Sequence, residues 1–349
     1  MPELIVTNFN PNFTGVSATA AGVLRAQAPR YDLALAGEPL PGCPAPITRA
    51  AAARASRVPP HGRDVIIWHV RRNTEMRAAL WARDVLRLPV RIVFTSAAQR
   101  RHSAFPRWLI SRMDAVIATT ERAAEFVPHV RAVVPHGVDT ETFTPAPDRA
   151  KAWAATGHPG TRGIATIGRI RAEKGTDRFV EAMVHFLPEN PDVTALIVGR
   201  AERGDKTFLP GLKARIAAKN LQDRIVFLGE IPPAKLPALM RSLSAVVQLP
   251  RYEGYGMAPL EGMASGVPFV ATDQGFYRSF SGQGSCGAIV SEDAPQQTAE
   301  ALSALLNDPA RHAKAAQSSR SAAVSHFSVQ TEADGIAAVY DQIWNTARA

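Results

Sequence analysis

The stretch RYEGYGMAPLEGMASGVPFVATD, residues 251–273, predicts a loop, a short apolar helix, a turn and a buried strand in immediate succession. It carries two carboxylates, Glu253 and Glu261, eight positions apart. The loop between them is rich in glycine and leads into the helix through Gly254, Tyr255, Gly256 and Met257. A helix that follows a loop and precedes a buried strand is typical of an α/β fold with a parallel sheet.

This arrangement suits a ligand that carries both phosphate and hydroxyl groups. A glycine loop at a helix start presents free backbone N–H groups and the positive end of the helix dipole, and both stabilise a phosphate. Ionised carboxylates such as Glu253 and Glu261 accept hydrogen bonds from adjacent hydroxyls. A nucleotide sugar carries both groups. The alternative is that Glu253 is a surface loop acid and that Glu261 lies on the solvated face of a helix.

A second cluster lies upstream in GRIRAEKG, residues 168–175. It follows a predicted strand at residues 164–167 and precedes a predicted helix at residues 176–187. Arg169 and Lys174 would flank a turn at the carboxyl end of that strand, where open α/β sheets bind ligands. Arginine binds a phosphate through two donors and lysine supplies a compact charge. A solvated basic turn is the alternative.

Short β-rich runs alternate with helix-period segments along the whole chain. The predicted strands are residues 4–7, 33–36, 65–68, 91–95, 115–118, 132–134, 164–167, 195–198, 225–228, 245–249, 267–271 and 288–290. The predicted helices include residues 16–27, 75–86, 106–111, 121–126 and 176–187, and residues 295–349 are helical without a strand signal. This alternation indicates parallel sheets with helices on both faces. The rhythm breaks at residues 136–160, where we expect an interdomain linker, and 349 residues favour two domains.

Positive charge is concentrated in the first half, where 16 Arg and six Asp or Glu lie between Arg49 and Arg131. This excess indicates an anionic partner such as nucleic acid, a membrane surface or a phosphorylated substrate. The codon bias of a GC-rich genome is an alternative reason for the preference for Arg over Lys. Two cysteines, Cys43 and Cys286, exclude a disulfide framework and fit a reducing compartment. We expect no signal peptide and no spanning helix, because no apolar run approaches about 18 residues.

Several enzyme classes lack their motifs. The dinucleotide-binding fingerprint fails at Pro259, where close packing of helix on strand needs a glycine. The sequence has no Asp-x-Asp pair and no metal-ligand spacing, so we expect no metal and no cofactor. It also has no Gly-x-Ser-x-Gly nucleophile elbow.

Taken together, four features resemble the family-4 retaining glycosyltransferases, which have the GT-B fold. They are the Glu253-x7-Glu261 segment, the turn at residues 168–175, the segment HGVD with FTP at residues 136–145, and the early loop around Gly15. The resemblance implies an α/β protein with two Rossmann-like domains facing across a cleft. Residues 1–145, with a returning helix at residues 329–349, would form the acceptor-side domain. Residues 146–328 would bind the nucleotide sugar.

Two further segments, WHVRRN at residues 68–73 and TSAAQRRH at residues 95–102, resemble the bacterial lipopolysaccharide-core mannosyltransferases. This resemblance implies a cytoplasmic, metal-independent enzyme at the inner face of the membrane that moves mannose from GDP-mannose to a lipopolysaccharide-core acceptor. A UDP-hexose donor and another glycolipid or polysaccharide acceptor stay open. A nucleotide-sugar 2-epimerase fits the Glu253 and Glu261 pattern poorly. A basic nucleic-acid-binding protein is the remaining alternative, although no nucleic-acid motif supports it.

The resemblance also implies roles for individual residues. Glu253 would hold sugar hydroxyls and orient the anomeric carbon, and Glu261 would bind the ribose. Without a metal, stabilisation of the leaving diphosphate falls to Arg169, Lys174 and the helix start. The full set expected to bind the donor is Gly15, Arg169, Lys174, Leu228, Gly254, Tyr255, Gly256, Met257 and Glu261. Gly15 has a plain alternative as a turn glycine.

The active-site histidine common in the family is missing, because Ala97 stands at that position. His69, at the end of the strand at residues 65–68, is the nearest substitute, and a structural role is its alternative. His136 is a lesser candidate.

An acceptor or membrane face is expected along residues 99–112, where Arg residues alternate with aromatic and aliphatic side chains. A helix starting near Pro106 would place Phe105, Trp108, Leu109 and Arg112 on one side. The expected contact residues are Arg71, Arg72, Arg100, Arg101, Arg107 and Trp108. The alternative is an ordinary amphipathic helix that packs on the sheet.

Overall fold

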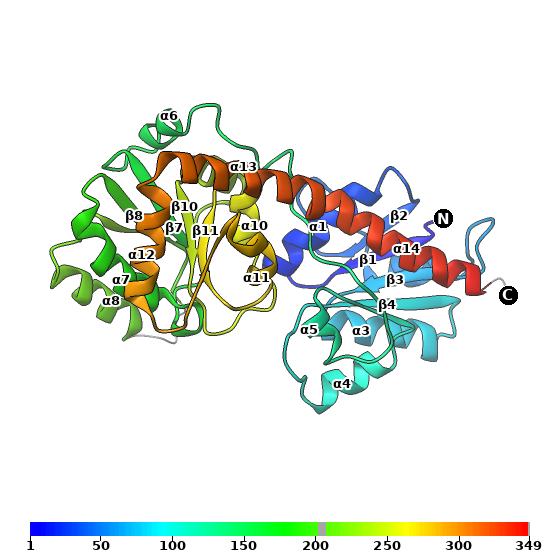
Figure 1. Ribbon diagram of the computed structural model, residues 1–349. Coiled ribbons are helices and arrows are strands. Elements are labelled where there is room, and N and C mark those ends of the chain that lie inside the picture. Colours follow the sequence, from blue (N-terminus) through cyan, green and yellow to red (C-terminus); the bar gives the residue numbers. More distant parts are fainter. Residues whose placement is uncertain (202–206, 348–349) are drawn as a thin grey trace. The chain divides into compact units, whose positions relative to one another are not determined.

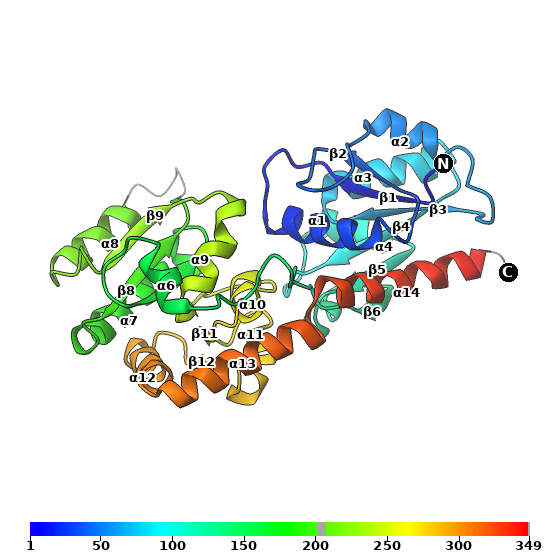
Figure 2. The same ribbon diagram turned by 90° about the horizontal axis from the view of Figure 1, so that it is seen from above.

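The computed structural model describes residues 1–201 and 207–347, and the chain divides into two compact units (Figures 1 and 2). Unit 1 contains residues 1–137 and the segment from residue 327 onward, and unit 2 contains residues 138–326. Each unit is built on a parallel sheet of six strands, so the α/β expectation is confirmed. Arg348 and Ala349, which belong to the expected returning helix, lie outside the described residues.

The sheet of unit 1 has the strand order β2-β1-β3-β4-β5-β6. Its strands are β1 (Leu4–Asn8), β2 (Leu33–Gly37), β3 (Ile66–Val70), β4 (Val90–Ser96), β5 (Ala115–Ala118) and β6 (Val130–Val133). Its helices are α1 (Gly15–Gln27), α2 (Arg49–Ala55), α3 (Asn73–Leu80), α4 (Ala104–Ser111), α5 (Glu121–Ala124) and α14 (Val329–Ala347). A π-helical turn, Trp81–Val85, extends α3.

Unit 1 buries apolar side chains on both faces of its sheet. Helices α1 and α14 cover one face, and α3 and α4 cover the other (Figure 1). Trp344 of α14 is buried to 1% exposure and donates from Nε1 to the carbonyl of Val65 at 3.1 Å. Burial of a side chain of this size contributes roughly 3 kcal/mol or more, which explains why α14 belongs to unit 1 although it is the last helix of the chain.

The sheet of unit 2 has the strand order β12-β11-β10-β7-β8-β9. Its strands are β7 (Arg162–Ile167), β8 (Val193–Val198), β9 (Ile225–Gly229), β10 (Ala245–Gln248), β11 (Phe269–Thr272) and β12 (Gly287–Val290). Its helices are α6 (Arg149–Ala154), α7 (Thr176–Phe186), α8 (Phe208–Ala217), α9 (Leu236–Ser242), α10 (Met257–Ala264), α11 (Tyr277–Phe280), α12 (Pro295–Leu306) and α13 (Pro309–His326). Short 3-10 turns are Ala172–Lys174, Leu187–Glu189, Pro233–Lys235 and Gly282–Gly284.

All twelve predicted strands are present, but most of the expected linker at residues 136–160 is packed within unit 2. The boundary between the units falls after Gly137, and residues 138–160 belong to unit 2. Within them α6 is capped by Asp148, whose carboxylate accepts from the N–H of Lys151 at 3.0 Å. Trp153 of α6 is buried to 1% exposure against the start of β7, where a Cβ at Gly163 would overlap its ring. Proline and glycine therefore marked turns around a short packed helix here.

Three helices in unit 1 also differ from expectation. The α2 helix had no sequence signal, because its run of Ala and Arg lacks an apolar period. The helix expected at residues 75–86 is an α-helix only to Leu80 and continues as a π-helical turn, in which Leu86 N–H bonds to the Trp81 carbonyl. The α4 helix starts at Ala104, so Pro106 is its third residue, where a missing N–H is still tolerated.

Candidate functional site

The first part of the candidate site lies at the carboxyl edge of the unit 2 sheet. The first strand, β7, pairs with β8 on one side and with β10 on the other. From β7 the chain adds β8 and β9 on one side of the sheet, and then β10, β11 and β12 on the other side. The position between β7 and β10 is therefore a topological switch point, where open α/β folds bind ligands in a crevice. The loop after β7 carries Arg169 and Lys174, and the loop after β10 carries Glu253 and Gly256. Tertiary structure therefore brings the two sequence clusters to one edge.

Lys174 and Glu253 are in direct contact. The Lys174 Nζ donates to Glu253 Oε2 at 2.8 Å, and both side chains are about three-quarters buried, with exposures of 24% and 22%. The second carboxylate oxygen of Glu253 accepts from the N–H of Gly254 at 2.9 Å. The turn that presents Lys174 ends on Gly175, which is left-handed at φ 72°, and a Cβ there would overlap the carbonyl oxygen of Leu249.

The glycine loop opens α10 without a capping side chain. Gly256 is the N-cap of α10, at φ 101°, and as a glycine it has no side chain to accept from the first turn of this helix. The free N–H groups of that turn therefore stay available for an anion, as an uncapped helix start requires. A Cβ at Gly256 would come within 2.0 Å of the Tyr277 ring, so the position needs glycine for both conformation and space.

Glu261 lies one turn further along α10 and is partly buried. Desolvation raises the pKa of its carboxyl group to about 8. Because burial penalises the charged form, the Glu261 carboxyl is protonated near neutral pH when no ligand contacts it.

Arg251 joins the two loops, a role that the sequence analysis missed. Its N–H donates to the carbonyl of Glu173 at 2.9 Å, and its guanidinium binds Asp177 at 2.7 and 2.8 Å. The same side chain donates to the carbonyl of Ala172. A bidentate Arg–carboxylate pair fixes geometry as well as charge, so Arg251 holds the Lys174 turn against the Glu253 loop. No sequence signal distinguishes such an arginine from one that contacts a ligand.

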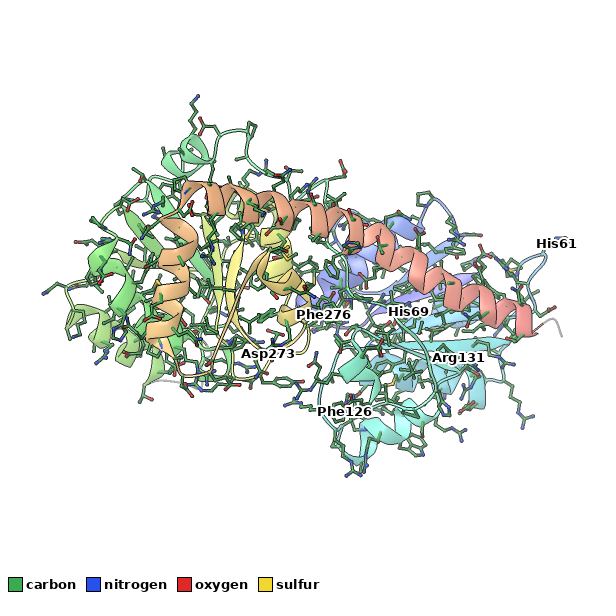
Figure 3. All side chains as sticks on the ribbon, in the orientation of Figure 1. His61, His69, Phe126, Arg131, Asp273 and Phe276 are labelled. Carbon is green, nitrogen blue, oxygen red and sulfur yellow. The ribbon has the colours of Figure 1, made fainter. Side chains whose placement is uncertain are left out.

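The loop after β11 supports the glycine loop from the other side (Figure 3 labels Asp273 and Phe276). The Tyr255 ring stacks on Phe276 with centroids 5.3 Å apart, and meets the edge of Phe280 at 5.5 Å. Tyr255 is only 4% exposed, so its ring anchors the loop, and the expected contact of its side chain with a donor is corrected to packing inside unit 2. Buried Tyr277 also lies near Glu253, whose charge together with burial raises the Tyr277 pKa. The sequence analysis missed Phe276 and Tyr277.

The remaining expected donor residues of unit 2 lie at the same edge of the sheet. Arg169 is exposed on the loop after β7, and Met257 is the first residue of α10. Leu228 lies in the edge strand β9 and is partly buried. Because β8 separates β9 from β7, Leu228 lies at the flank of the crevice.

Unit 1 has its own switch point between β1 and β3, and a buried carboxylate fills it. Glu75 is 0% exposed and accepts from Thr7 Oγ1, from the N–H groups of Phe9, Arg71 and Arg72, and from the Arg72 guanidinium. It thus joins the loop after β1 to the loop after β3. Charge-assisted bonds of this kind are shorter and stronger than neutral ones.

Arg72 is corrected from a surface contact to part of this network. Its guanidinium donates to Asn8 Oδ1 at 2.9 Å, Ser17 Oγ at 2.8 Å and Thr14 Oγ1 at 3.2 Å. Arg72 therefore holds the loop that leads to Gly15. A Cβ at Gly15 would meet no atom within 4 Å, so space on this loop is open and does not by itself require glycine.

His69 is corrected from a ligand-facing group to a core residue. It lies inside β3, which runs on to Val70, and it is 0% exposed (Figure 3). Its Nδ1 lies 2.5 Å from Tyr340 Oη of α14, and its Nε2 lies 2.7 Å from Thr95 Oγ1. Burial, with smaller contributions from Arg71 and His136, holds the His69 pKa well below its usual value. A neutral imidazole with both nitrogens engaged positions β3, β4 and α14 and leaves no group to touch a substrate.

His136 is likewise occupied within unit 1. Its Nδ1 lies 2.7 Å from Glu332 Oε1, and Glu332 Oε2 accepts from the N–H of Gly137 at 2.7 Å. This pair joins the end of unit 1's first segment to α14.

The expected acceptor or membrane residues separate into two groups. Arg71 is corrected from the surface to the interior, because it is only 8% exposed. Arg100, Arg101, Arg107 and Trp108 are exposed. A groove of about 650 Å³ lies between α3 and α4 and is lined in part by Phe105, Trp108, Leu109 and Arg112. These four residues were predicted to share one side of the helix.

Within residues 1–201 and 207–347, no group of three or more His, Cys, Asp or Glu side chains is placed to hold a metal ion. None of the helices in these described ranges combines the length and apolar content that a membrane span needs.

Comparison with known proteins adds a consistent picture. Residues 150–322 match the family described as glycosyl transferases group 1. The chain is 39% identical over 346 residues to the lipopolysaccharide core biosynthesis mannosyltransferase LpsB of Rhizobium meliloti, covering 98% of this chain and 97% of that protein. It is 36% identical to the lipopolysaccharide core biosynthesis mannosyltransferase LpcC of Rhizobium leguminosarum bv. viciae, over 99% of this chain and 98% of that protein. The crystal structure of Anabaena HepE in complex with UDP superposes with a TM-score of 0.80 at 18% identity, covering 97% of this chain and 99% of that chain.

Replacement of Gly256 by alanine tests the geometry of the glycine loop. We expect Gly256→Ala to destabilise unit 2 by about 1–3 kcal/mol, because a Cβ is strained at positive φ and overlaps Tyr277. Urea unfolding followed by circular dichroism measures the loss. Gly211→Ala in α8 is the control, because a Cβ meets nothing within 4 Å there and the helix favours alanine. Equal stability of the two variants would show that the loop does not need the left-handed conformation.

Proposed function

The chain belongs to the glycosyltransferase group 1 family and has the GT-B fold, and on this premise we propose that it transfers mannose from GDP-mannose to a lipopolysaccharide-core acceptor. The observation that carries the proposal is the juxtaposition of Lys174, Glu253 and the uncapped start of α10 at the switch point of unit 2. The choice of mannose and of the acceptor is supported by the names of the two Rhizobium relatives. A UDP-hexose donor is the second candidate, favoured by the UDP bound to the HepE neighbour.

The residues of unit 2 account for the chemistry of donor cleavage. As the bond from the anomeric carbon to the diphosphate breaks, negative charge develops on the leaving nucleoside diphosphate. Lys174, which is about three-quarters buried, stabilises that charge together with the exposed Arg169 and the N–H groups at the start of α10, and fixed donors act strongly where water is excluded. Glu253, already held by Lys174, accepts from the sugar hydroxyls and orients the anomeric carbon. Transfer proceeds with retention, as expected for the family, and without a metal ion.

The donor assignment predicts which variants lose transfer. We expect Lys174→Ala and Arg169→Ala each to lower kcat/KM by an amount equal to about 2–4 kcal/mol, because each removes a cation from the diphosphate. Calorimetry with GDP-mannose, UDP-glucose and UDP-galactose identifies the donor, and turnover is measured with and without EDTA. Lys219→Ala, on an exposed side chain after α8, is the control. Unchanged transfer in both variants, or loss of turnover in EDTA with recovery in Mg²⁺, would remove these cations from the diphosphate site.

Ribose binding by Glu261 predicts a pH dependence of nucleotide affinity. Ribose hydroxyls donate to an ionised carboxylate, whereas the free protein holds a carboxyl with a pKa of about 8. Binding therefore releases a proton below pH 8, and the association constant should rise by up to tenfold per pH unit and level off above that pKa. Calorimetry of GDP binding between about pH 7 and pH 9, in two buffers of different ionisation enthalpy, measures both effects. Glu261→Gln should flatten the profile, and a flat profile in the wild type would contradict the ribose assignment.

We also propose that unit 1 docks on the inner face of an anionic cytoplasmic membrane through the α3–α4 groove. Its walls expose Trp81 and Trp108 to 53% and 56%, and Phe105 stacks on Trp108 with centroids 6.2 Å apart. Exposed aromatic side chains of this number are uncommon on a soluble surface and mark interaction sites. Arg49, Arg77 and Arg112 also line the groove, together with one acid, Asp84, which pairs with Arg112 at 3.3 Å. The net charge of these four residues is positive, which matches an anionic lipid surface.

Two pairs of substitutions separate the electrostatic and the apolar contributions to docking. Arg100→Glu with Arg101→Glu should lower binding to phosphatidylglycerol vesicles at least about tenfold at low salt, with a smaller effect at high salt, because the attraction is screened. Phe105→Ser with Trp108→Ser should lower binding at both salt concentrations. Arg311→Glu, exposed on α13 of unit 2, is the charge control. Sedimentation with vesicles measures binding, and wild-type levels in both pairs would exclude the groove.

A further inference from the structure

Arg71 directly follows β3, at the carboxyl edge of the unit 1 sheet. Its side chain is 8% exposed, and within the described residues none of its three guanidinium nitrogens has a hydrogen-bond partner. Only its backbone is engaged, through the N–H that donates to Glu75 Oε2 at 2.7 Å. A guanidinium carries five N–H donors, so an unpaired one in the interior costs several kcal/mol, and folded proteins keep very few.

Neighbouring groups compensate the charge of Arg71 only at a distance. Burial lowers the pKa of Arg71, while Tyr340, Glu332 and Glu75 act in the opposite direction. Both carboxylates are bonded to other partners, Glu332 to His136 and Gly137, and Glu75 to the two loops that it joins. The guanidinium therefore remains charged, as arginine does at neutral pH, and its donors are not used by the fold.

A second group at the same edge is unpartnered in the same way. Thr119, directly after β5, is 0% exposed, and its Oγ1 has no hydrogen-bond partner among the described residues. The registers Val70↔Phe94 and Ser96↔Ala118 show that β4 and β5 end level with each other, whereas β3 ends two residues earlier. Alternation along the strands places Arg71 and Thr119 on the face that α14 covers, together with His69. Both buried groups therefore lie on one face near the carboxyl edge of the sheet, with β4 between their strands, and α/β sheets bind ligands at this edge.

The chemistry of these donors selects an anion. The pair offers one positive charge, a planar fork of N–H groups and a hydroxyl, and neighbouring His69 is held neutral by burial. A guanidinium fork matches the two oxygens of a carboxylate or a phosphate, whereas neutral hydroxyls use it poorly. Arg71 also lies apart from the α3–α4 groove, whose lining does not include it.

We propose that Arg71, assisted by Thr119, is the subsite that recognises an acidic group, a carboxylate or a phosphate, on the acceptor saccharide. The proposal rests on the glycosyltransferase function proposed above in one respect, that the ligand is an acceptor sugar. The proposal explains why the protein keeps a buried arginine whose side chain makes no hydrogen bond within the described residues. A residue that lowers stability is retained when it binds a ligand.

Binding of simple sugars to the full chain tests the subsite. The probes are methyl glucoside, methyl glucuronide and glucose phosphate, titrated by ligand-observed NMR in the presence of saturating GDP. We expect the wild type to bind at least one acidic probe about tenfold or more tightly than methyl glucoside, and the preferred acid identifies the source of the charge. Arg71→Met should abolish the preference, and Arg71→Lys should weaken it by loss of the fork. Arg122→Met, on exposed Arg122 of α5, should retain it.

Stability and nucleotide binding keep the result interpretable. Because the Arg71 guanidinium has no hydrogen-bond partner in the described part of the chain, Arg71→Met should leave the thermal midpoint of the free protein unchanged or raise it. GDP binding, which belongs to unit 2, should be kept. Equal affinity of the wild type for acidic and neutral probes, as expected if Arg71 holds only internal water, would overturn the inference. So would a full acid preference in Arg71→Met. Loss of nucleotide binding in the wild type would instead overturn the proposed function.

Discussion

The parallel pairing of β7 with β10 is the constraint on which the candidate donor site depends. This pairing places two loops that are some 80 positions apart in the chain at one edge of the sheet. The strands that follow β7 and those that follow β10 lie on opposite sides of this pair, which leaves a crevice between the two loops. The contact between Lys174 and Glu253 follows from this pairing, as does the clamp that Arg251 makes across the two loops. The glycine residues permit the close approach, and the charged pairs then fix it.

The two units treat the same topological position differently. In unit 2 the switch point is lined by glycine and by the start of α10, whose N-cap Gly256 has no side chain to cap the backbone N–H groups. In unit 1 the switch point is closed by the buried Glu75 network, whose bonds to backbone N–H groups and to Arg72 make the loops after β1 and β3 one rigid body. Removal of one partner of such a buried pair costs roughly 3–5 kcal/mol, which is a large fraction of a domain's stability. Rigid loops of this kind suit the positioning of an acceptor.

Charged residues in unit 1 were the hardest to interpret from sequence. His69, Arg71 and Arg72 stand together between a strand and a helix, and a run of polar residues there normally indicates a solvated turn. Their burial follows from Glu75 and from α14, which lies more than 250 positions away along the chain. Local pattern contains no information on a partner at that separation. The same limit applies to Arg251. The sequence around it does not distinguish an arginine that joins two loops from an arginine that contacts a ligand.

The sequence by itself determined the α/β class, the twelve strands, and the position of the two clusters around Lys174 and Glu253, because hydrophobic period and glycine placement are local signals. The sequence also indicated that Phe105, Trp108, Leu109 and Arg112 lie on one side of α4, the side that lines the groove, because helical spacing is fixed by the backbone. Only the tertiary structure decided that Lys174 meets Glu253, that Tyr255 is an anchor, that His69 is a core residue, and that the Arg71 guanidinium is buried with no hydrogen-bond partner among the residues the structure describes. These outcomes depend on burial and on partners brought from distant segments, and burial is a property of the folded chain and not of any local segment.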